Sequence, residues 1–363
     1  MSESFARIRH WVDARPGRVA VGLSAFVVLA GLLKYGISVR GSWELLLEVA
    51  VNWRDPMANG YIPEGQAWIL GSPVAAVLSG VLGLNDPTTY ISGQVVLACA
   101  AISIPFLMPT LRSAAGSSRL LAVLLIGGPL VPVLLNSIGG YDAITVIGFA
   151  LAVLSRSAGV AAVGWFLAAA NHPLLALIAL VIWLPSAWLS AIGIPTSTMR
   201  RHLLPAGIGT SVGWFVNNQL MVWWEVPLSR GDVRYPFDYY LSQLQLYFPL
   251  SLFVVLGVGW IIFLDPSLRQ IPLVKYLLGA SLVAGIAFPL IGSDITRLAA
   301  VGMYPALLQW IRVSEPTVGV TECRRLWSRY VVTSLVIPVP MLFGSGIYLT
   351  GWQGFLYWSA SLQ

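Results

Sequence analysis

The chain begins with residues 1–36, MSESFARIRHWVDARPGRVAVGLSAFVVLAGLLKYG, in which a basic segment runs into an apolar stretch. About 20 apolar residues are enough for one helix to cross a membrane. The stretch lacks a clear small-residue cleavage site, so we interpret it as a retained first helix and not as a signal peptide. The remaining chain is similar: 57% of the 363 residues are hydrophobic and 10% are charged, with a mean hydropathy of +0.78. Soluble domains carry roughly 25% charged residues. We therefore predict an all-α, polytopic integral membrane protein.

Further apolar segments predict about ten or eleven spanning helices. Segments of suitable length are 17–37, 90–109, 119–138, 141–155, 203–223, 245–264, 273–292, 296–313 and 329–350. Two more, 67–85 and 158–192, are ambiguous. No soluble domain is attached, so residues 1–363 are expected to form one integral membrane domain, with an N-terminal module over 17–192 and C-terminal helices over 203–350.

Arginines in the short loops set the expected orientation, because positive residues favour cytoplasmic loops. The basic start places the N-terminus in the cytoplasm and the loop 38–66 outside. Arg112, Arg119 and Arg156 fall inside only if the first ambiguous segment does not fully cross and the second forms two shorter segments. If the first segment crosses, these arginines face outward. We prefer the former topology because it obeys the charge rule everywhere, and we expect a multi-pass protein of a bacterial plasma membrane.

The net charge of +6 comes mostly from these loop arginines, so it predicts orientation and no nucleic-acid partner. The acidic residues lie outside or at the outer membrane level under the preferred topology. They include Glu44, Glu48, Asp55, Glu64, Asp142, Glu225, Asp232, Asp238 and Asp294. Membrane insertion requires no such bias of acidic residues. The pattern therefore indicates a polar cavity that opens to the outer face.

The first outer loop holds a candidate catalytic residue. Residues 43–51 carry apolar side chains at helical spacing, which is typical of a helix lying in the membrane interface. The sequence NWRDP breaks this helix and places Asp55 beside Arg54, close to the apolar phase yet reachable from water. Such a carboxylate can act as a general base towards an acceptor hydroxyl. The alternative is a turn-forming Asp-Pro pair.

A second candidate region is the polar turn in residues 136–156, NSIGGYDAITVIGFALAVLSR. Tyr141 and Asp142 follow two glycines and open an apolar run. A carboxylate at this place is favoured by the helix dipole, so simple capping explains Asp142 without a function. The functional interpretation is a turn that faces the cavity, with Tyr141 and Asp142 binding substrate.

Residues 166–180, FLAAANHPLLALIAL, place Asn171 and His172 within apolar sequence, directly before Pro173. The residue before a proline is pushed out of helical geometry, so we predict a break here with His172 reachable from water. A broken helix at membrane depth is tolerated where it is buried in protein or lines a cavity. The alternative is a histidine with a packing role, and no second histidine lies nearby to suggest zinc.

Two arginine-containing segments complete the candidate substrate-binding set. Arg230 and Arg234 lie in an aromatic-rich stretch, where the guanidinium fork suits a phosphate, although an interfacial aromatic belt explains most of that stretch. Asp294 and Arg297, in GSDITR, lie three positions apart on one helix face and can neutralise each other. Charges at membrane depth indicate a functional site, with an ion pair at a helix end as the alternative.

Several kinds of site are not indicated. The cysteines Cys99 and Cys323 match neither a disulfide framework nor a metal motif. The chain contains no Walker loop, dinucleotide fingerprint, nucleophile elbow or HExxH motif, so a soluble nucleotide is unsupported as a direct substrate. No convincing inverted repeat is present, which weakens the usual picture of a secondary transporter.

The layout over residues 17–192 resembles the GT-C class of polytopic glycosyltransferases. It has a first span, an outer loop with interfacial helices and an early aspartate, and a short segment broken by a polar residue before proline. The stretch GGYDAITVIGFALAVLSRSAGVAAVGWFLAAANHPLLALIALVIWLP is similar to the members that depend on a polyprenyl-phosphate sugar. The resemblance implies an inverting transfer of a sugar from a lipid-phosphate donor to a glycan, lipid or protein acceptor at the outer face. It also implies that Asp55 is the base. Many members have paired acids in that loop, and Gln or Lys where Asp142 and His172 stand.

Three hypotheses follow from these observations. In a glycosyltransferase, Asp55 would deprotonate the acceptor, while Arg230, Arg234 or Arg297 would stabilise the departing lipid phosphate. In a secondary transporter or a flippase for lipid-linked saccharides, histidine and aspartate side chains would form an intramembrane relay. In a non-catalytic scaffold, each charge would be a cap or an anchor. The charges crowd toward one side of the membrane, which favours the enzyme. No cofactor is indicated, and dependence on a divalent cation stays open.

Overall fold

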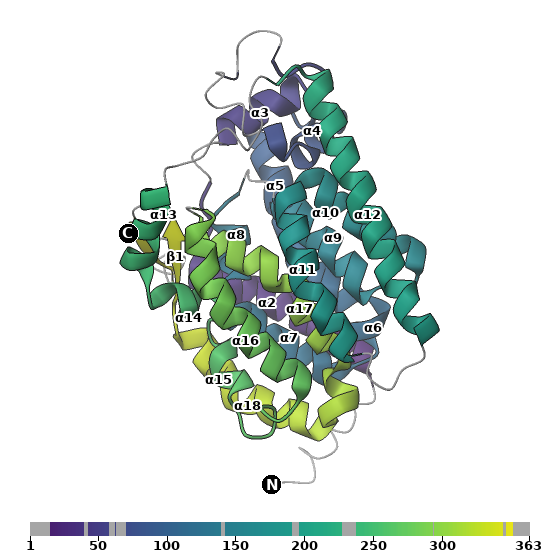
Figure 1. The fold of residues 1–363 in the computed structure, drawn as a ribbon, viewed down its shortest axis with the longest axis vertical. Coiled ribbons are helices and arrows are strands. Elements are labelled where there is room, and N and C mark those ends of the chain that lie inside the picture. The colour runs from purple at the N-terminus through teal and green to yellow at the C-terminus, as the bar shows by residue number, and fades with distance from the viewer. Residues whose placement is uncertain are drawn as a thin grey trace.

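The computed structural model describes residues 15–39, 43–57, 62, 70–138, 142–190, 196–226, 237–292, 294–343 and 346–350. It confirms an all-α fold apart from one two-stranded hairpin (Figure 1). The N-terminal helices are α2 (Pro16–Tyr35), α3 (Trp43–Val51), α4 (Val74–Val81), α5 (Pro87–Leu107), α6 (Pro109–Arg112), α7 (Ala115–Gly127), α8 (Leu130–Leu135) and α9 (Asp142–Leu154). They are followed by α10 (Ala158–Asn171), α11 (Pro173–Ser190), α12 (Thr196–Trp223), α13 (Phe237–Tyr247), α14 (Leu250–Leu256), α15 (Gly259–Phe263), α16 (Pro272–Ala287), the 3₁₀ turn η2 (Phe288–Leu290), α17 (Ile295–Val318) and α18 (Val320–Val336).

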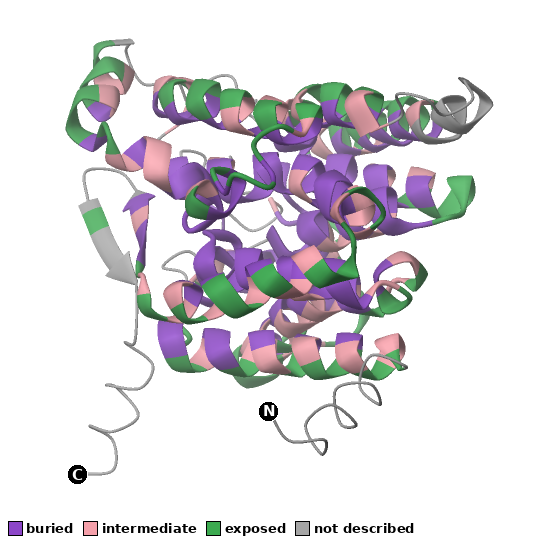
Figure 2. Ribbon diagram, turned by 90° about the horizontal axis from the view of Figure 1, so that it is seen from below, coloured by how far each residue is buried: buried purple, intermediate pink, exposed green. Residues whose placement is uncertain are grey.

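Three apolar helices, α7, α9 and α17, form the centre of the molecule, and nearly all of their side chains are buried. α9 packs against α5, α10 and α17, while α7 packs against α2, α17 and α18. α17 is also covered by α11, α14 and α16. Figure 2 shows the buried residues in the interior and the exposed ones along the outward faces of the surrounding helices. Both ends of α9 and α17 are therefore positioned by helices on several sides.

Glycine lets α9 approach α10 closely. A Cβ atom added at Gly148 of α9 would lie 2.6 Å from the carbonyl oxygen of Gly164 in α10, and a Cβ at Gly164 would overlap the carbonyl of Gly148 in return. Small residues that allow close backbone contact are typical of helix packing in membranes. This contact fixes α10, and hence the break at its end, against α9.

A second, smaller hydrophobic core lies beside the main one. It joins α3 and α4 to the start of α5, to α9 through Ile144 and to the end of α12 through Trp224. α3 and α4 lie at one end of the long axis of the molecule, with α18 toward the other end (Figure 1). α3 and α4 thus form a packed cap on the helical body.

Four helices are long and apolar enough to span a membrane, namely α2, α5, α11 and α16 extended by η2. The described residues give up to five spans if α13 and α14, which are bent by 78° relative to each other, count as one. Large apolar side chains point outward from several helices, as expected of surfaces in contact with lipid. They include Leu29, Val96, Val181, Phe215 and Val283.

The structure confirms the local predictions for the N-terminal half. The interfacial segment 43–51 is α3, with the same bounds. Within segment 67–85, the described residues 70–85 contain one α-helix, α4, whose eight residues extend about 12 Å, which is less than a hydrocarbon core of about 30 Å. Segment 158–192 is two helices, α10 and α11, separated at His172.

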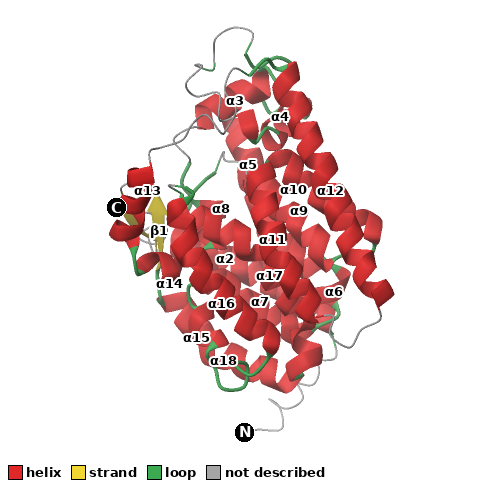
Figure 3. Cartoon of the chain, viewed as in Figure 1, coloured by secondary structure: helices red, strands yellow, loops and turns green. Residues whose placement is uncertain are grey.

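Three of the expected spans are wrong as continuous helices. Residues 329–350 leave the helix after α18, and β1 (Val339–Phe343) pairs antiparallel with β2 (Gly346–Thr350) at one edge of the body (Figure 3). Pro338 and Pro340 explain this, because each favours extended backbone in the residue before it. Residues 119–138 divide at Gly128, which is extended before Pro129. Residues 245–264 divide between α14 and α15, at a glycine with φ +55°.

Candidate functional site

The N-termini of α9 and α17 meet in a buried ion pair. Nε of Arg297 donates a hydrogen bond of 2.7 Å to Oδ1 of Asp142, and the two side chains are 10% and 3% exposed. Asp294 lies on the other side of Arg297, with its Oδ2 3.9 Å from Nη1 of the guanidinium, and its own side chain is 21% exposed. We call Asp142, Asp294 and Arg297 the α9–α17 junction. It joins positions 155 residues apart in the sequence.

Asp294 contacts Arg297 twice, through the backbone N–H and through the guanidinium. Asp294 is the N-cap of α17, where its Oδ1 accepts a hydrogen bond of 3.3 Å from the backbone N–H of Arg297. A carboxylate at this position satisfies one of the free N–H groups of the first turn. Asp294 therefore pairs with Arg297 as predicted, and the shorter, buried contact of the guanidinium is an additional one with Asp142.

Asp142 also lines a small cavity of about 10 Å³ together with Gln94, Ser137 and neighbouring apolar side chains. This volume is close to the minimum that holds one water molecule, roughly 10–15 Å³. Oδ2 of Asp142 is buried and has no hydrogen-bond partner among the described residues. A buried carboxylate oxygen without a partner carries a free-energy penalty, so this oxygen is a place where a donor from a ligand or water would be favoured.

Asn171, the last residue of α10, connects α10 to α9 and α4. Its partner on α9 lies about one turn beyond Asp142. Nδ2 of Asn171 donates 3.0 Å to the hydroxyl of Thr145 on α9, and its Oδ1 accepts 3.2 Å from the backbone N–H of Val74 at the start of α4. Asn217 of α12 supports the same point by donating 2.7 Å to the carbonyl of Ala170. Asn171 therefore lies near the α9–α17 junction. Its hydrogen bonds hold the cap formed by α3 and α4 on the helical body.

His172 confirms the predicted break but not the predicted exposure. Its φ and ψ of −149° and 78° end α10, and Pro173 opens α11. The side chain is only 8% exposed, and its Nδ1 accepts a 3.4 Å hydrogen bond from the N–H of Leu175. The histidine turns back onto the first turn of α11, where N–H groups have no partner within the helix. The prediction that the His172 side chain is reachable from water is therefore wrong.

Asp55 and Arg54 lie in the turn after α3, and both are exposed. The Arg54 guanidinium stacks 5.2 Å from the ring centre of Trp53. Trp53 packs on α4, where a Cβ at Gly80 would lie 2.6 Å from its Cδ1. Gly80 is six residues from Val74, or about 9 Å along the helix. Asp55 thus lies in a turn that packs on α4, the helix whose start is hydrogen-bonded to Asn171.

The opposite ends of the same helices carry arginines. Arg312 of α17 donates 3.0 Å to the carbonyl of Val153 in the last turn of α9, so α9 and α17 run parallel and are joined at both ends. Arg156, just beyond α9, lies near Ser113, and Arg112 lies near Gly17 at the start of α2. Arg112, Arg156 and Arg312 therefore lie toward the end of the bundle away from the α9–α17 junction.

Sequence reasoning missed two charged groups that position the helices, the buried Lys34 and the partly buried Glu315. Nζ of Lys34 is completely buried and donates 2.6–3.1 Å hydrogen bonds to the carbonyls of Ile126, Ser334 and Ile337, at the C-terminal ends of α7 and α18. Glu315 accepts 2.6 Å from the N–H of Gly116 and so caps the start of α7. No short-range pattern identifies these partners, because each lies far away in the sequence.

A third missed group is Asp265, in the turn after α15. Its carboxylate accepts hydrogen bonds from Arg325, Arg329, Tyr330 and Ser267. Burial alone would raise the pKa of the Asp265 carboxyl, but the hydrogen bonds from Tyr330, Ser267 and Arg325 outweigh it and hold the pKa well below its ordinary value. This cluster ties the turn to α18, away from the α9–α17 junction.

Several predicted positions receive no test. Tyr141, Arg230 and Arg234 lie outside the described residues. Within the described part of the chain, no group of three or more His, Cys, Asp or Glu side chains is placed to hold a metal ion. Cys99 and Cys323 are free thiols.

Comparisons with protein-family models, with curated proteins and with solved structures find no match to this chain. Function is therefore argued from the site. The α9–α17 junction offers a guanidinium suited to a phosphate, a carboxylate oxygen without a hydrogen-bond partner, and an exposed carboxylate on the neighbouring cap.

Proposed function

We propose that the protein is a membrane glycosyltransferase that moves a sugar from a polyprenyl-phosphate donor to an acceptor at the outer face of the membrane. The observation that carries this proposal is the buried pair between Arg297 and Asp142, next to a cap that bears the exposed Asp55. Apolar outward faces on the candidate spanning helices support a membrane location. The proposal includes the ten or eleven membrane-spanning helices predicted from the sequence.

The proposed reaction is a single displacement. Asp55 takes the proton from the acceptor hydroxyl, and the acceptor oxygen attacks the anomeric carbon of the sugar. The bond from that carbon to the phosphate oxygen breaks, and its electron pair leaves with the lipid phosphate. Arg297 stabilises the charge on the leaving phosphate through charge-assisted hydrogen bonds. Arg54, Arg230 and Arg234 are further candidates for this role.

The test is sugar transfer by the full-length chain in proteoliposomes, with a panel of polyprenyl-phosphate sugars as donors. Asp55→Asn should leave folding intact and abolish transfer, because the amide keeps the shape but cannot take a proton. Glu44→Gln removes an exposed carboxylate of the same cap and is the matched control. Transfer by Asp55→Asn equal to that of the control would reject the assigned base.

A second variant tests the phosphate role. Arg297→Lys keeps the charge but loses the planar fork, so it should raise the KM for the donor more than it lowers the stability. An unchanged KM in a folded protein would remove Arg297 from the donor site.

One observation favours a second candidate, a secondary transporter or a flippase for lipid-linked saccharides. Oδ2 of Asp142 is buried without a hydrogen-bond partner among the described residues, as a proton or ion relay would require. His172 and Asp294 would be the other members of such a relay. Movement of a labelled lipid-linked sugar across the bilayer without chemical transfer would favour this candidate over the enzyme.

A further inference from the structure

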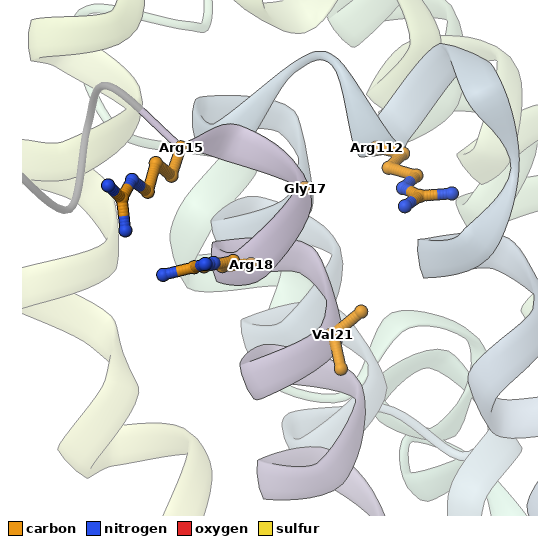
Figure 4. Close-up of a pocket in the computed structure, with 5 residues that line it drawn as sticks. All are labelled: Arg15, Gly17, Arg18, Val21 and Arg112. Carbon is orange, nitrogen blue, oxygen red and sulfur yellow. The ribbon is translucent and has the colours of Figure 1, made fainter.

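A basic pocket lies at the end of the bundle away from the α9–α17 junction. It has a volume of about 410 Å³ and is lined by Arg15, Gly17, Arg18 and Val21 of the first turns of α2 and by Arg112 of α6. We call it the arginine pocket. Figure 4 shows Arg15 and Arg18 on one side of the first turn of α2, Arg112 on the other, and Gly17 between them. The guanidinium groups of Arg15 and Arg18 point away from that of Arg112, so positive charge lies on both sides of the turn.

Gly17 lines the arginine pocket without a side chain and so leaves space beside Arg112. A Cβ atom added there would lie 3.3 Å from Nε of Arg112. A side chain at this position would therefore occupy the space between the arginines. The pocket depends on the shape of this turn as well as on its charge.

The surface below the arginine pocket is apolar. Arg18 heads a stripe on α2 that continues at helical spacing through Val21, Leu29 and Leu33, which are 50–59% exposed. The stripe from Arg18 to Leu33 is about 22 Å long. α2 is also one of the helices long and apolar enough to cross a membrane. Arginines next to an exposed apolar stripe complement an anionic lipid, whose phosphate is negative and whose acyl chains are apolar.

We propose that the arginine pocket binds the headgroup phosphate of an anionic phospholipid. The non-bridging phosphate oxygens accept hydrogen bonds from the arginines that line the pocket, since the fork of arginine matches phosphate geometry. One acyl chain of the lipid lies along the apolar stripe of α2. This site requires neither the proposed reaction nor its donor, because it lies at the other end of the helices.

The test is a lipid titration of the full-length chain in detergent, followed by native mass spectrometry. Phosphatidylglycerol should form a one-to-one adduct more tightly than phosphatidylcholine. Arg15→Gln, Arg18→Gln and Arg112→Gln should each weaken phosphatidylglycerol binding about fivefold. Arg269→Gln removes the same charge from an exposed arginine in the turn after α15 and should leave the affinity unchanged. Equal affinity of the pocket variants and this control would overturn the proposal.

Gly17→Leu separates a shaped pocket from general attraction to positive charge. It leaves every arginine in place and improves helix propensity, so it should fold, yet it should weaken phosphatidylglycerol binding at least fivefold by filling the pocket. Unchanged binding by Gly17→Leu would overturn the site in favour of diffuse electrostatics. Inorganic phosphate should compete only weakly, since it lacks the acyl chain; competition at concentrations similar to those of the lipid would overturn the lipid as the ligand.

Discussion

The buried pair between Asp142 and Arg297 predicts a specific order of stabilities. Asp142→Asn removes the charge of the short partner of the guanidinium and leaves the carboxylate of Asp294, 3.9 Å away, as the charged partner in the described part of the chain. Asp294→Asn leaves the short pair intact, and asparagine is itself a good N-cap. The two aspartates are therefore matched variants that separate burial from sequence proximity.

The expected magnitudes follow from exposure. Removing one partner of a buried pair costs about 3–5 kcal/mol, and Asp142→Asn should lie near the lower limit because the amide oxygen still accepts a hydrogen bond. Asp294 is 21% exposed, and a contact of this kind contributes about 0–1 kcal/mol. The double variant Asp142→Leu/Arg297→Met should recover most of the loss, because it leaves no buried charge without a partner.

The assay is equilibrium unfolding of the full-length protein by SDS in mixed micelles, followed by circular dichroism. The structure requires Asp142→Asn to lower the free energy of unfolding by at least about 2 kcal/mol more than Asp294→Asn. It also requires Asp142→Leu/Arg297→Met to be more stable than Asp142→Leu alone. A larger loss for Asp294→Asn, or no recovery in the double variant, would refute this account of the junction.

Three further changes test other contacts by the same titration. Asn171→Ala should cost about 2 kcal/mol through its two lost hydrogen bonds, whereas the exposed Asn85→Ala should be near neutral; equal costs would contradict the role in joining the cap. Glu315→Gln should cost about 1 kcal/mol by removing the charge at the start of α7, and a neutral result would contradict that cap. Because the pKa of Asp265 is lowered in the folded state, its contribution is present above its unfolded pKa of 3.8 and is lost as the pH falls below it. Asp265→Asn should therefore lower stability at neutral pH and weaken the loss of stability from about pH 5 downwards; an unchanged acid profile would count against it.

Sequence reasoning succeeded where the determinant was local. The bounds of α3 follow from apolar spacing within nine residues, and the break at His172 follows from the proline next to it. The balance of arginines along the chain disfavoured a full span over 67–85, and the described residues there form one short helix, α4. Each of these features depends on neighbours in the sequence or on a sum over short loops.

It failed where the determinant was a distant partner. The spacing of three residues predicted the contact between Asp294 and Arg297, but it did not predict the shorter contact of Arg297 with Asp142, 155 positions away. Lys34 was likewise hidden at the end of an apolar run, although it caps two helices formed much later in the chain. Hydropathy also cannot distinguish a spanning helix from an apolar hairpin, so the strands after α18 were missed.

The question raised by the buried charges is why α9 and α17 are joined by an ion pair when apolar packing would suffice. Removing two charges from water is costly, and apolar residues of similar volume often stabilise such a contact equally well. α17 is already joined to α9 at its other end, where Arg312 binds the carbonyl of Val153. Cohesion alone therefore gives weak grounds for keeping Asp142 and Arg297. Oδ2 of Asp142 has no hydrogen-bond partner among the described residues, so that cohesion does not use it, and Asp142 lines a cavity with room for about one water molecule. The proposed ligand-binding role would account for this oxygen, which cohesion leaves unexplained.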